Sequence, residues 1–168
     1  MPQGLKQSSS VVSIGFSVTE SAANTFTQGS VDLNLSPLDR EVFVVLAVNL
    51  DPESPDMLDG NNTFTNSSLT TTSQTAVSTL ADSNCLSVAN ERIRSTAAMA
   101  VGFTTAALET PPATLEYIGI IATNDFFVQV IGSGNAAAKG VSGKMYGYRA
   151  VADASIYAAL VQSEVLSA

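Results

Sequence analysis

The sequence predicts an all-β protein: an antiparallel β-sandwich, as a single jelly roll of about eight strands, with one C-terminal amphipathic α-helix. Apolar and polar residues alternate with a period of two along most of the chain, which is the pattern of half-buried strands. Helical spacing of apolar residues occurs only at the C-terminal end, and no strand–helix–strand alternation or internal repeat is present. Alternation does not distinguish a jelly roll from other sandwich topologies.

The length indicates a single domain. A chain of 168 residues and 17.4 kDa can bury one substantial core but is short for two. We divide it into a flexible, Ser-rich N-terminal arm (residues 1–10), a β-sandwich domain (residues 11–152) and a C-terminal helix (residues 153–168).

The first half of the chain contains three predicted strands. Residues 12–18 and 31–35 alternate between apolar and small polar side chains. Residues 41–48 are almost continuously apolar, which is typical of a strand buried on both faces in the middle of a sheet. The prolines in residues 51–56 then indicate a long loop. Residues 61–79 are rich in Thr and Ser, and they fit either an exposed edge strand or a solvated loop.

The second half has weaker alternation at residues 84–94 and a candidate strand at residues 97–105. Two β-rich runs, residues 115–121 and 126–131, flank Asn124-Asp125, a pair suited to a turn, so we predict a hairpin there. A last strand is expected at residues 144–150.

The C-terminal segment has helical periodicity. Asp153 can act as the N-cap, and Tyr157, Leu160, Val161 and Val165 fall on one face of the helix that follows. This apolar stripe is expected to bury itself against the domain or against a neighbouring subunit.

The composition excludes most of the common kinds of catalytic site. The chain has no His, no Trp and a single Cys, Cys85, which excludes His-based nucleophilic triads, zincin-type sites and intramolecular disulfides. Carboxylate or lysine chemistry is possible in principle, but no pair of acids stands out. A net charge of −8 and a pI near 4.2 give no signature of nucleic-acid binding. We therefore expect neither an enzyme nor a bound cofactor.

Membrane insertion and secretion have no support in the sequence. The longest apolar run, residues 42–48, is far shorter than the ~20 residues of a membrane-spanning helix. The first ten residues lack the apolar core of a signal peptide. We expect no transmembrane segment and, outside an assembly, a soluble protein.

Four acidic residues near one another, Asp51, Glu53, Asp56 and Asp59, are the only candidate metal ligands that the sequence groups together. Calcium requires six to eight oxygen ligands, and a flexible acidic loop can supply several. Their spacing does not match a twelve-residue EF-hand loop. A solvated surface loop is the simpler interpretation, and no metal site is predicted.

Two short charged clusters hold three of the arginines: Arg40 lies between Asp39 and Glu41, and Arg92 and Arg94 follow Glu91. Arginine pairs with carboxylates through two parallel hydrogen bonds and is suited to subunit interfaces. The alternative is ordinary surface ion pairing of little energetic value. The candidate interface residues are Arg40, Arg92, Arg94, Tyr157, Leu160, Val161 and Val165.

The chain has few charged residues and few residues of the types used in catalysis. This composition suits a chain that buries its surface against copies of itself, since obligate interfaces are apolar and poor in charge. The chain also resembles the small capsid proteins of environmental viruses with single jelly-roll shells, over residues 18–26, 38–45 and 147–150, beside its Met-Pro start and Ser-rich arm. The resemblance implies a coat subunit of a virion, a large homo-oligomer that also contacts other virion proteins. The N-terminal arm departs from many such proteins because Lys6 is its only basic side chain.

A second hypothesis comes from a different class. The chain is alternatively a non-catalytic β-sandwich binding module, a carbohydrate-binding or adhesin-like domain that uses calcium through the acidic loop. This hypothesis predicts a monomer with exposed aromatic side chains, and the absence of Trp counts against sugar binding.

Overall fold

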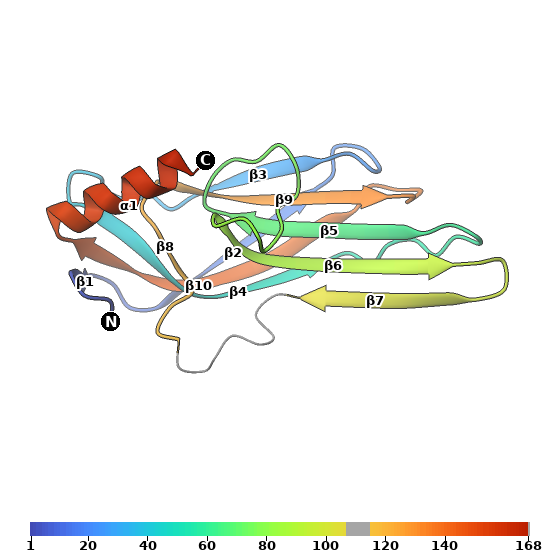
Figure 1. Ribbon diagram of the computed structural model, residues 1–168, viewed down its shortest axis with the longest axis horizontal. Coiled ribbons are helices and arrows are strands. Elements are labelled where there is room, and N and C mark those ends of the chain that lie inside the picture. The colour runs from blue at the N-terminus through green and yellow to red at the C-terminus, as the bar shows by residue number, and fades with distance from the viewer. Residues whose placement is uncertain (107–114, 168) are drawn as a thin grey trace.

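The computed structural model describes residues 1–106 and 115–167. Within these ranges the chain forms ten strands and one helix, arranged as two antiparallel sheets that pack face to face (Figure 1). The elements are β1 (Leu5–Gln7), β2 (Val12–Thr19), β3 (Thr27–Asp32), β4 (Glu41–Pro52), β5 (Thr63–Thr70), β6 (Cys85–Ser95), β7 (Ala100–Ala106), β8 (Gly119–Ile121), β9 (Asp125–Ser133), β10 (Gly140–Ala152) and α1 (Ala154–Leu166).

The strand order is that of a jelly roll. The first sheet contains β1, β2, β10, β4 and β8, and the second runs β3-β9-β5-β6-β7. With β1 and β7 set aside, the first strand pairs with the last, β2 with β10, and the inner pairs are β3 with β9, β4 with β8 and β5 with β6. An antiparallel ribbon rolled into two sheets gives this nesting. The predicted sandwich and its C-terminal helix are therefore confirmed.

The main core lies between the two sheets. Its largest fully buried side chains come from β4, β5, β9 and β10, and they include Phe43, Leu69, Phe126 and Met145. Strand β4 is central, between β10 and β8, and residues 42–45 are all buried. This matches the dense apolar pattern of that segment, because a strand with both faces covered has no solvent side to alternate with.

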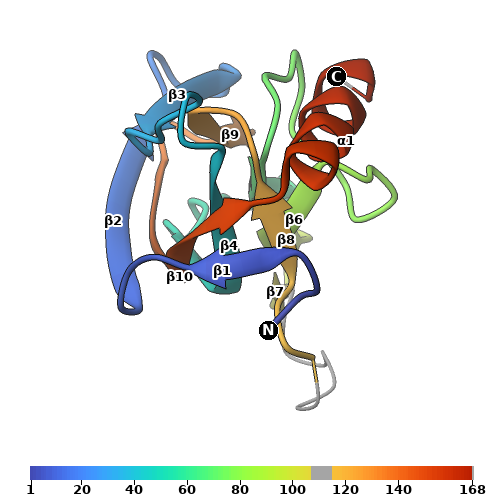
Figure 2. The same ribbon diagram turned by 90° about the vertical axis from the view of Figure 1, so that its left-hand side faces the viewer.

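A second apolar cluster seals one end of the molecule, which we call the covered end. Here α1 lies over the outer face of the first sheet, and β1 extends that sheet beside the end of β10 (Figure 2). Val44, Tyr148 and Ala150 of the sheet are buried in this cluster, and Tyr157 and Leu160 of α1 pack against it. The helix thus packs part of its apolar surface against its own domain, whereas Val165 and Leu166 near its end are exposed.

Three sequence-based expectations differ from the structure. Part of the predicted flexible arm is the strand β1, whose Leu5 is buried and pairs with Ala152. The predicted hairpin of residues 115–131 is wrong, because β8 pairs with β4 and β9 pairs with β3 and β5 in the opposite sheet. Asn124-Asp125 therefore lies where the chain crosses between sheets. Of the Thr- and Ser-rich residues 61–79, residues 63–70 form β5, which is an interior strand and not an edge strand, whereas residues 71–79 are a loop.

Candidate functional site

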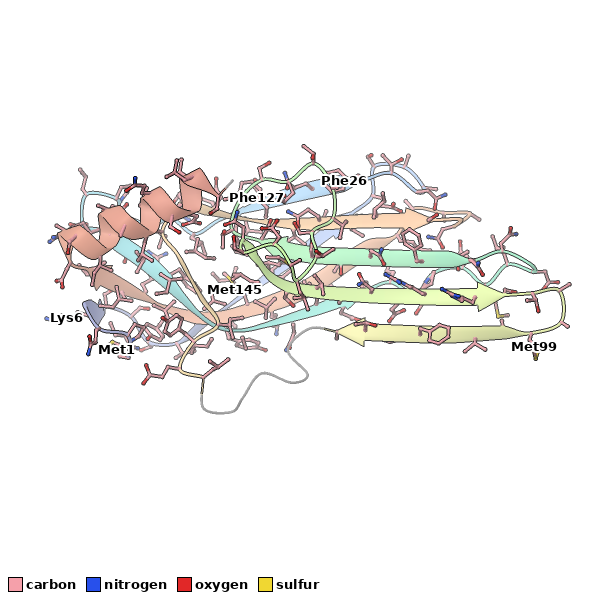
Figure 3. The ribbon with its side chains drawn as sticks, viewed as in Figure 1. Met1, Lys6, Phe26, Met99, Phe127 and Met145 are labelled. Atoms are coloured by element: carbon pink, nitrogen blue, oxygen red, sulfur yellow. The ribbon has the colours of Figure 1, made fainter. Side chains whose placement is uncertain are left out.

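The end opposite the covered end is formed by the β6–β7 turn and the loop after β4, and we call it the open end (Figure 1). Met99, at the tip of the β6–β7 turn, lies far from Met1 and Lys6 (Figure 3). Among the described residues, 1–106 and 115–167, strand β7 is paired on one side only, with β6. Residues 100–105 are all exposed, so both faces of this strand are in contact with solvent.

β7 lacks the devices that usually protect an edge strand. Such strands are commonly blunted by charged residues, proline or a β-bulge, since their free backbone groups can pair with another chain. Residues 100–106 contain no charge and no proline, and their register with β6 is unbroken. Val101 and Phe103 are about half exposed, at 53% and 52%, and Met99 is 74% exposed.

Two arginines lie on the outer face of the second sheet beside these apolar side chains. Arg92 is registered between Phe64 of β5 and Phe103 of β7, and Arg94 is registered beside Val101. Both arginines are exposed, and neither has a hydrogen-bond or ion-pair partner within residues 1–106 and 115–167. This mixture of Arg, aromatic side chains and Met is the composition typical of interface hot spots.

The surface around these arginines is hollowed. One hollow of about 280 Å³ is lined by Phe64, Asn66, Arg92 and Arg94, and a second of about 390 Å³ by Arg94, Met99, Val101 and Phe103, with smaller polar neighbours. We refer to Phe64, Arg92, Arg94, Val101 and Phe103 as the arginine face. The sequence singled out its two arginines, but their alignment with Phe64 and Phe103 depends on strand register.

The acidic residues proposed as weak calcium ligands are not brought together. Asp56 forms an ion pair with Lys139, 2.7 Å from carboxylate oxygen Oδ1 to Nζ, and also accepts a hydrogen bond from the Ala136 amide at 2.8 Å. The hydrogen bond from Lys139 is the main cause that lowers the pKa of Asp56 below its ordinary value. No group of three or more potential metal ligands occurs within the described residues. Asp59 is exposed and takes no part in this ion pair, so the structure does not group the four acids.

Asp51 and Glu53 instead line a polar groove at the open end. Asp51 is the second-last residue of β4, and Glu53 directly follows the strand. The Glu53 carboxylate accepts a hydrogen bond from the amide of Gly140 at 3.1 Å. The groove has a volume of about 450 Å³ and is otherwise lined by small residues, including Ser17, Thr19 and Ser142. Both carboxylates are exposed, and neither is ion-paired within the described residues. We call this feature the acidic groove.

The remaining interface candidates lie at the covered end. Arg40 is exposed, in a left-handed backbone conformation (φ 55°), at the turn that leads into β4. Tyr157, Leu160 and Val161 pack on the intramolecular cluster beneath α1. Val165 is 59% exposed, so the predicted apolar stripe stops short of it. Asp153 is the N-cap residue, as predicted, but its side chain makes no capping hydrogen bond.

The buried residue of α1 is a carboxylate that the sequence analysis missed. Glu164 is 7% exposed, and it accepts hydrogen bonds from the amides of Ala122 and Thr123, at 2.8 and 3.2 Å, and from the Thr123 hydroxyl at 2.7 Å. Burial raises its pKa above the ordinary value, and these hydrogen bonds oppose that shift. Glu164 thus ties the helix to the crossing between β8 and β9. The sequence signal that could have identified Glu164 is that it is the only acidic residue in a mostly apolar helix.

Cys85 is the chain's one thiol. Burial raises its pKa to about 11, so the thiol is protonated at neutral pH. A protonated thiol is a poor nucleophile and a poor metal ligand. Cys85 begins β6, and in this position it acts as a small apolar side chain.

Comparison with family models, with curated proteins and with solved structures gave no match for this chain. In the described residues, no helix is both long and apolar enough to span a membrane. The features that bear on function are therefore those of the chain itself: the jelly roll, the unprotected β7, the arginine face and the acidic groove.

Proposed function

We propose that the chain is a non-catalytic structural subunit that assembles with copies of itself into a shell, and that this shell is a viral coat. The observation that carries the proposal is β7, an uncharged edge strand exposed on both faces and bearing Val101 and Phe103. A strand in this position buries little of its side-chain surface within its own domain. Contact with another subunit would bury its apolar side chains and pair its free backbone groups.

Two further features support a coat role. Jelly rolls recur in viral capsid subunits, although lectins share the architecture and fold alone does not decide function. A fraction of only 13% charged residues leaves a surface poor in charge, and charged residues are depleted in the cores of subunit interfaces. With a net charge of −8, such a shell would form without help from packaged nucleic acid.

The test is the mass of the purified protein by size exclusion with light scattering, followed by negative-stain microscopy of the leading peak. We expect closed shells or large regular arrays with an absorbance ratio typical of protein free of nucleic acid. A stable 17.4 kDa monomer across a wide range of salt, pH and protein concentration would contradict the proposal.

A binding module is the second candidate, and one observation favours it. Phe64 and Phe103 flank Arg92 on an open sheet face with two adjoining hollows, an arrangement that also suits a small ligand or a glycan. This function predicts a monomer whose Phe103→Ala variant loses binding on a glycan array. Assembly into shells by the wild-type chain would favour the coat function instead.

A further inference from the structure

The arginine face and the acidic groove lie at the same end of the molecule on opposite sheets. The arginine face is on the outer side of β5, β6 and β7, whereas the groove is on the outer side of β2, β4 and β10. A surface on one sheet cannot reach a surface on the other within one subunit. Two subunits stacked sheet to sheet, however, would bring one arginine face against one acidic groove.

The charges of the two surfaces are complementary in sign and in spacing. Arg92 and Arg94 are two residues apart on one face of β6, a separation of about 7 Å along a strand. Asp51 and Glu53 are likewise two residues apart and line one groove. Two guanidinium groups and two carboxylates at matching intervals can form paired, two-pronged hydrogen bonds.

The surroundings of each surface suit this contact. The acidic groove is bordered by small side chains such as Ser17 and Ser142, so a neighbouring sheet can approach closely. Lys144 is on the same face of β10 but does not line the groove. On the other side, Val101 and Phe103 beside the arginines supply apolar area that excludes water from the ion pairs.

We propose that the arginine face of one subunit docks into the acidic groove of a second copy of the chain. This inference rests on the proposed self-assembly and names its contact. The two surfaces differ, so the contact is heterologous: each subunit offers one of each, and repetition generates a ring, a closed shell or a filament rather than a closed dimer.

Charge reversal provides the test. The first variant is Arg92→Glu with Arg94→Glu, and the second is Asp51→Arg with Glu53→Arg. Each variant alone sets like charges against each other at every such contact, so we expect its mass in solution to fall to that of the monomer or a small oligomer. Mixed in equal amounts, the two variants restore opposite charges at both kinds of contact, and we expect large assemblies to return.

The matched control is Lys6→Glu at the covered end, which changes the net charge as much as Arg92→Glu alone does, so these two single variants are compared. We expect this control to assemble like the wild type. Far-UV circular dichroism and thermal unfolding establish that each variant is folded, and if the Arg variant of the groove misfolds, Asp51→Asn with Glu53→Gln replaces it, with weakened assembly expected.

The outcomes separate the two proposals. Failure of the wild type to assemble contradicts the proposed function. If the wild type and the Arg92→Glu, Arg94→Glu variant assemble to equal mass, the proposed function is supported but the docking contact is overturned. Loss of assembly in both variants without recovery on mixing also overturns it. Retention of single-stranded DNA by the wild type, lost only in the arginine variant, would assign the arginine face to nucleic acid instead.

Discussion

The outer face of a sheet is buried at one end of the sandwich and exposed at the other. At the covered end, α1 lies over the first sheet, of which β1 is an edge strand, and Val44 and Tyr148 are buried in a second cluster. At the open end, residues 100–105 of β7 are exposed, and the neighbouring hollows have no segment of the described chain over them. Burial at the covered end stabilises the subunit, whereas the exposed open end is where we propose contacts between subunits.

The largest expected effect on folding is at the covered end. Val44→Ala with Leu160→Ala removes apolar groups from both sides of the contact between sheet and helix, and we expect a loss of about 3 kcal/mol in the free energy of unfolding. Denaturant unfolding measures it. The control is Val101→Ala at the open end, expected within about 0.5 kcal/mol of the wild type. Equal losses in the two variants would remove the distinction between the ends.

The Glu164 contact should have the next largest effect. Glu164→Ala leaves the amides of Ala122 and Thr123 without their acceptor, which costs about 1–3 kcal/mol for buried groups. Glu164→Gln keeps a carbonyl oxygen at this position, so we expect a smaller loss. Denaturant unfolding of both variants provides the comparison, and an alanine variant as stable as the glutamine variant would show that these hydrogen bonds do not hold the helix.

The pH dependence of stability should differ between a buried and an exposed acid. The pKa of Glu164 is raised in the folded state, so its contribution to the free energy of unfolding is fully present below about pH 4.5, the ordinary value. This contribution is lost as the pH rises through the folded-state pKa, because the unfolded chain gives up the proton first. The pKa of Asp56 is lowered, so its contribution is present above about 3.8 and is lost as pH falls below that. Unfolding curves from pH 3 to 8 test both signs, with Glu164→Gln and Asp56→Asn each removing one trend.

Much of the fold could be predicted from the sequence because the strands bury alternating residues locally. Connectivity could not, since the run at residues 115–131 looks like a hairpin whichever sheets its strands join. The strands on either side of the turn join different sheets, and Gly119 of β8 lies close to Leu86 of β6 in the opposite sheet, a contact between distant segments. Alternation carries no information about such contacts.

Strand β5 shows a second limit of sequence-based prediction. Its Ser67 and Ser68 are fully buried, although their residue type favours the surface. The Ser67 hydroxyl donates to the Ala89 carbonyl and the Ser68 hydroxyl to the Gln129 side chain, so burial leaves neither hydroxyl unpaired. The partners come from β6 and β9, and no local pattern identifies them.

For the same reason, the sequence identified only some of the residues that share each candidate surface. Arg92 and Arg94 could be recognised as a charged pair, but Arg40, grouped with them by composition, lies at the other end of the molecule. Asp51 and Glu53 were grouped correctly, yet the groove that they line depends on β2 and β10. Strand register and sheet order, which the sequence does not encode locally, decide which charged residues share a surface.

The smallest expected effect on folding accompanies a large effect on assembly. Phe103→Ser at the open end removes an exposed apolar side chain from an edge strand, so we expect unfolding free energies within about 0.5 kcal/mol of the wild type. The assembled mass by light scattering should nevertheless fall, because the same ring would be buried between subunits in the proposed assembly. Leu38→Ser, at a 96% exposed position outside the open end, is the matched control and should preserve assembly. A Phe103→Ser chain that is markedly destabilised but still assembles would reverse the roles assigned to the two ends.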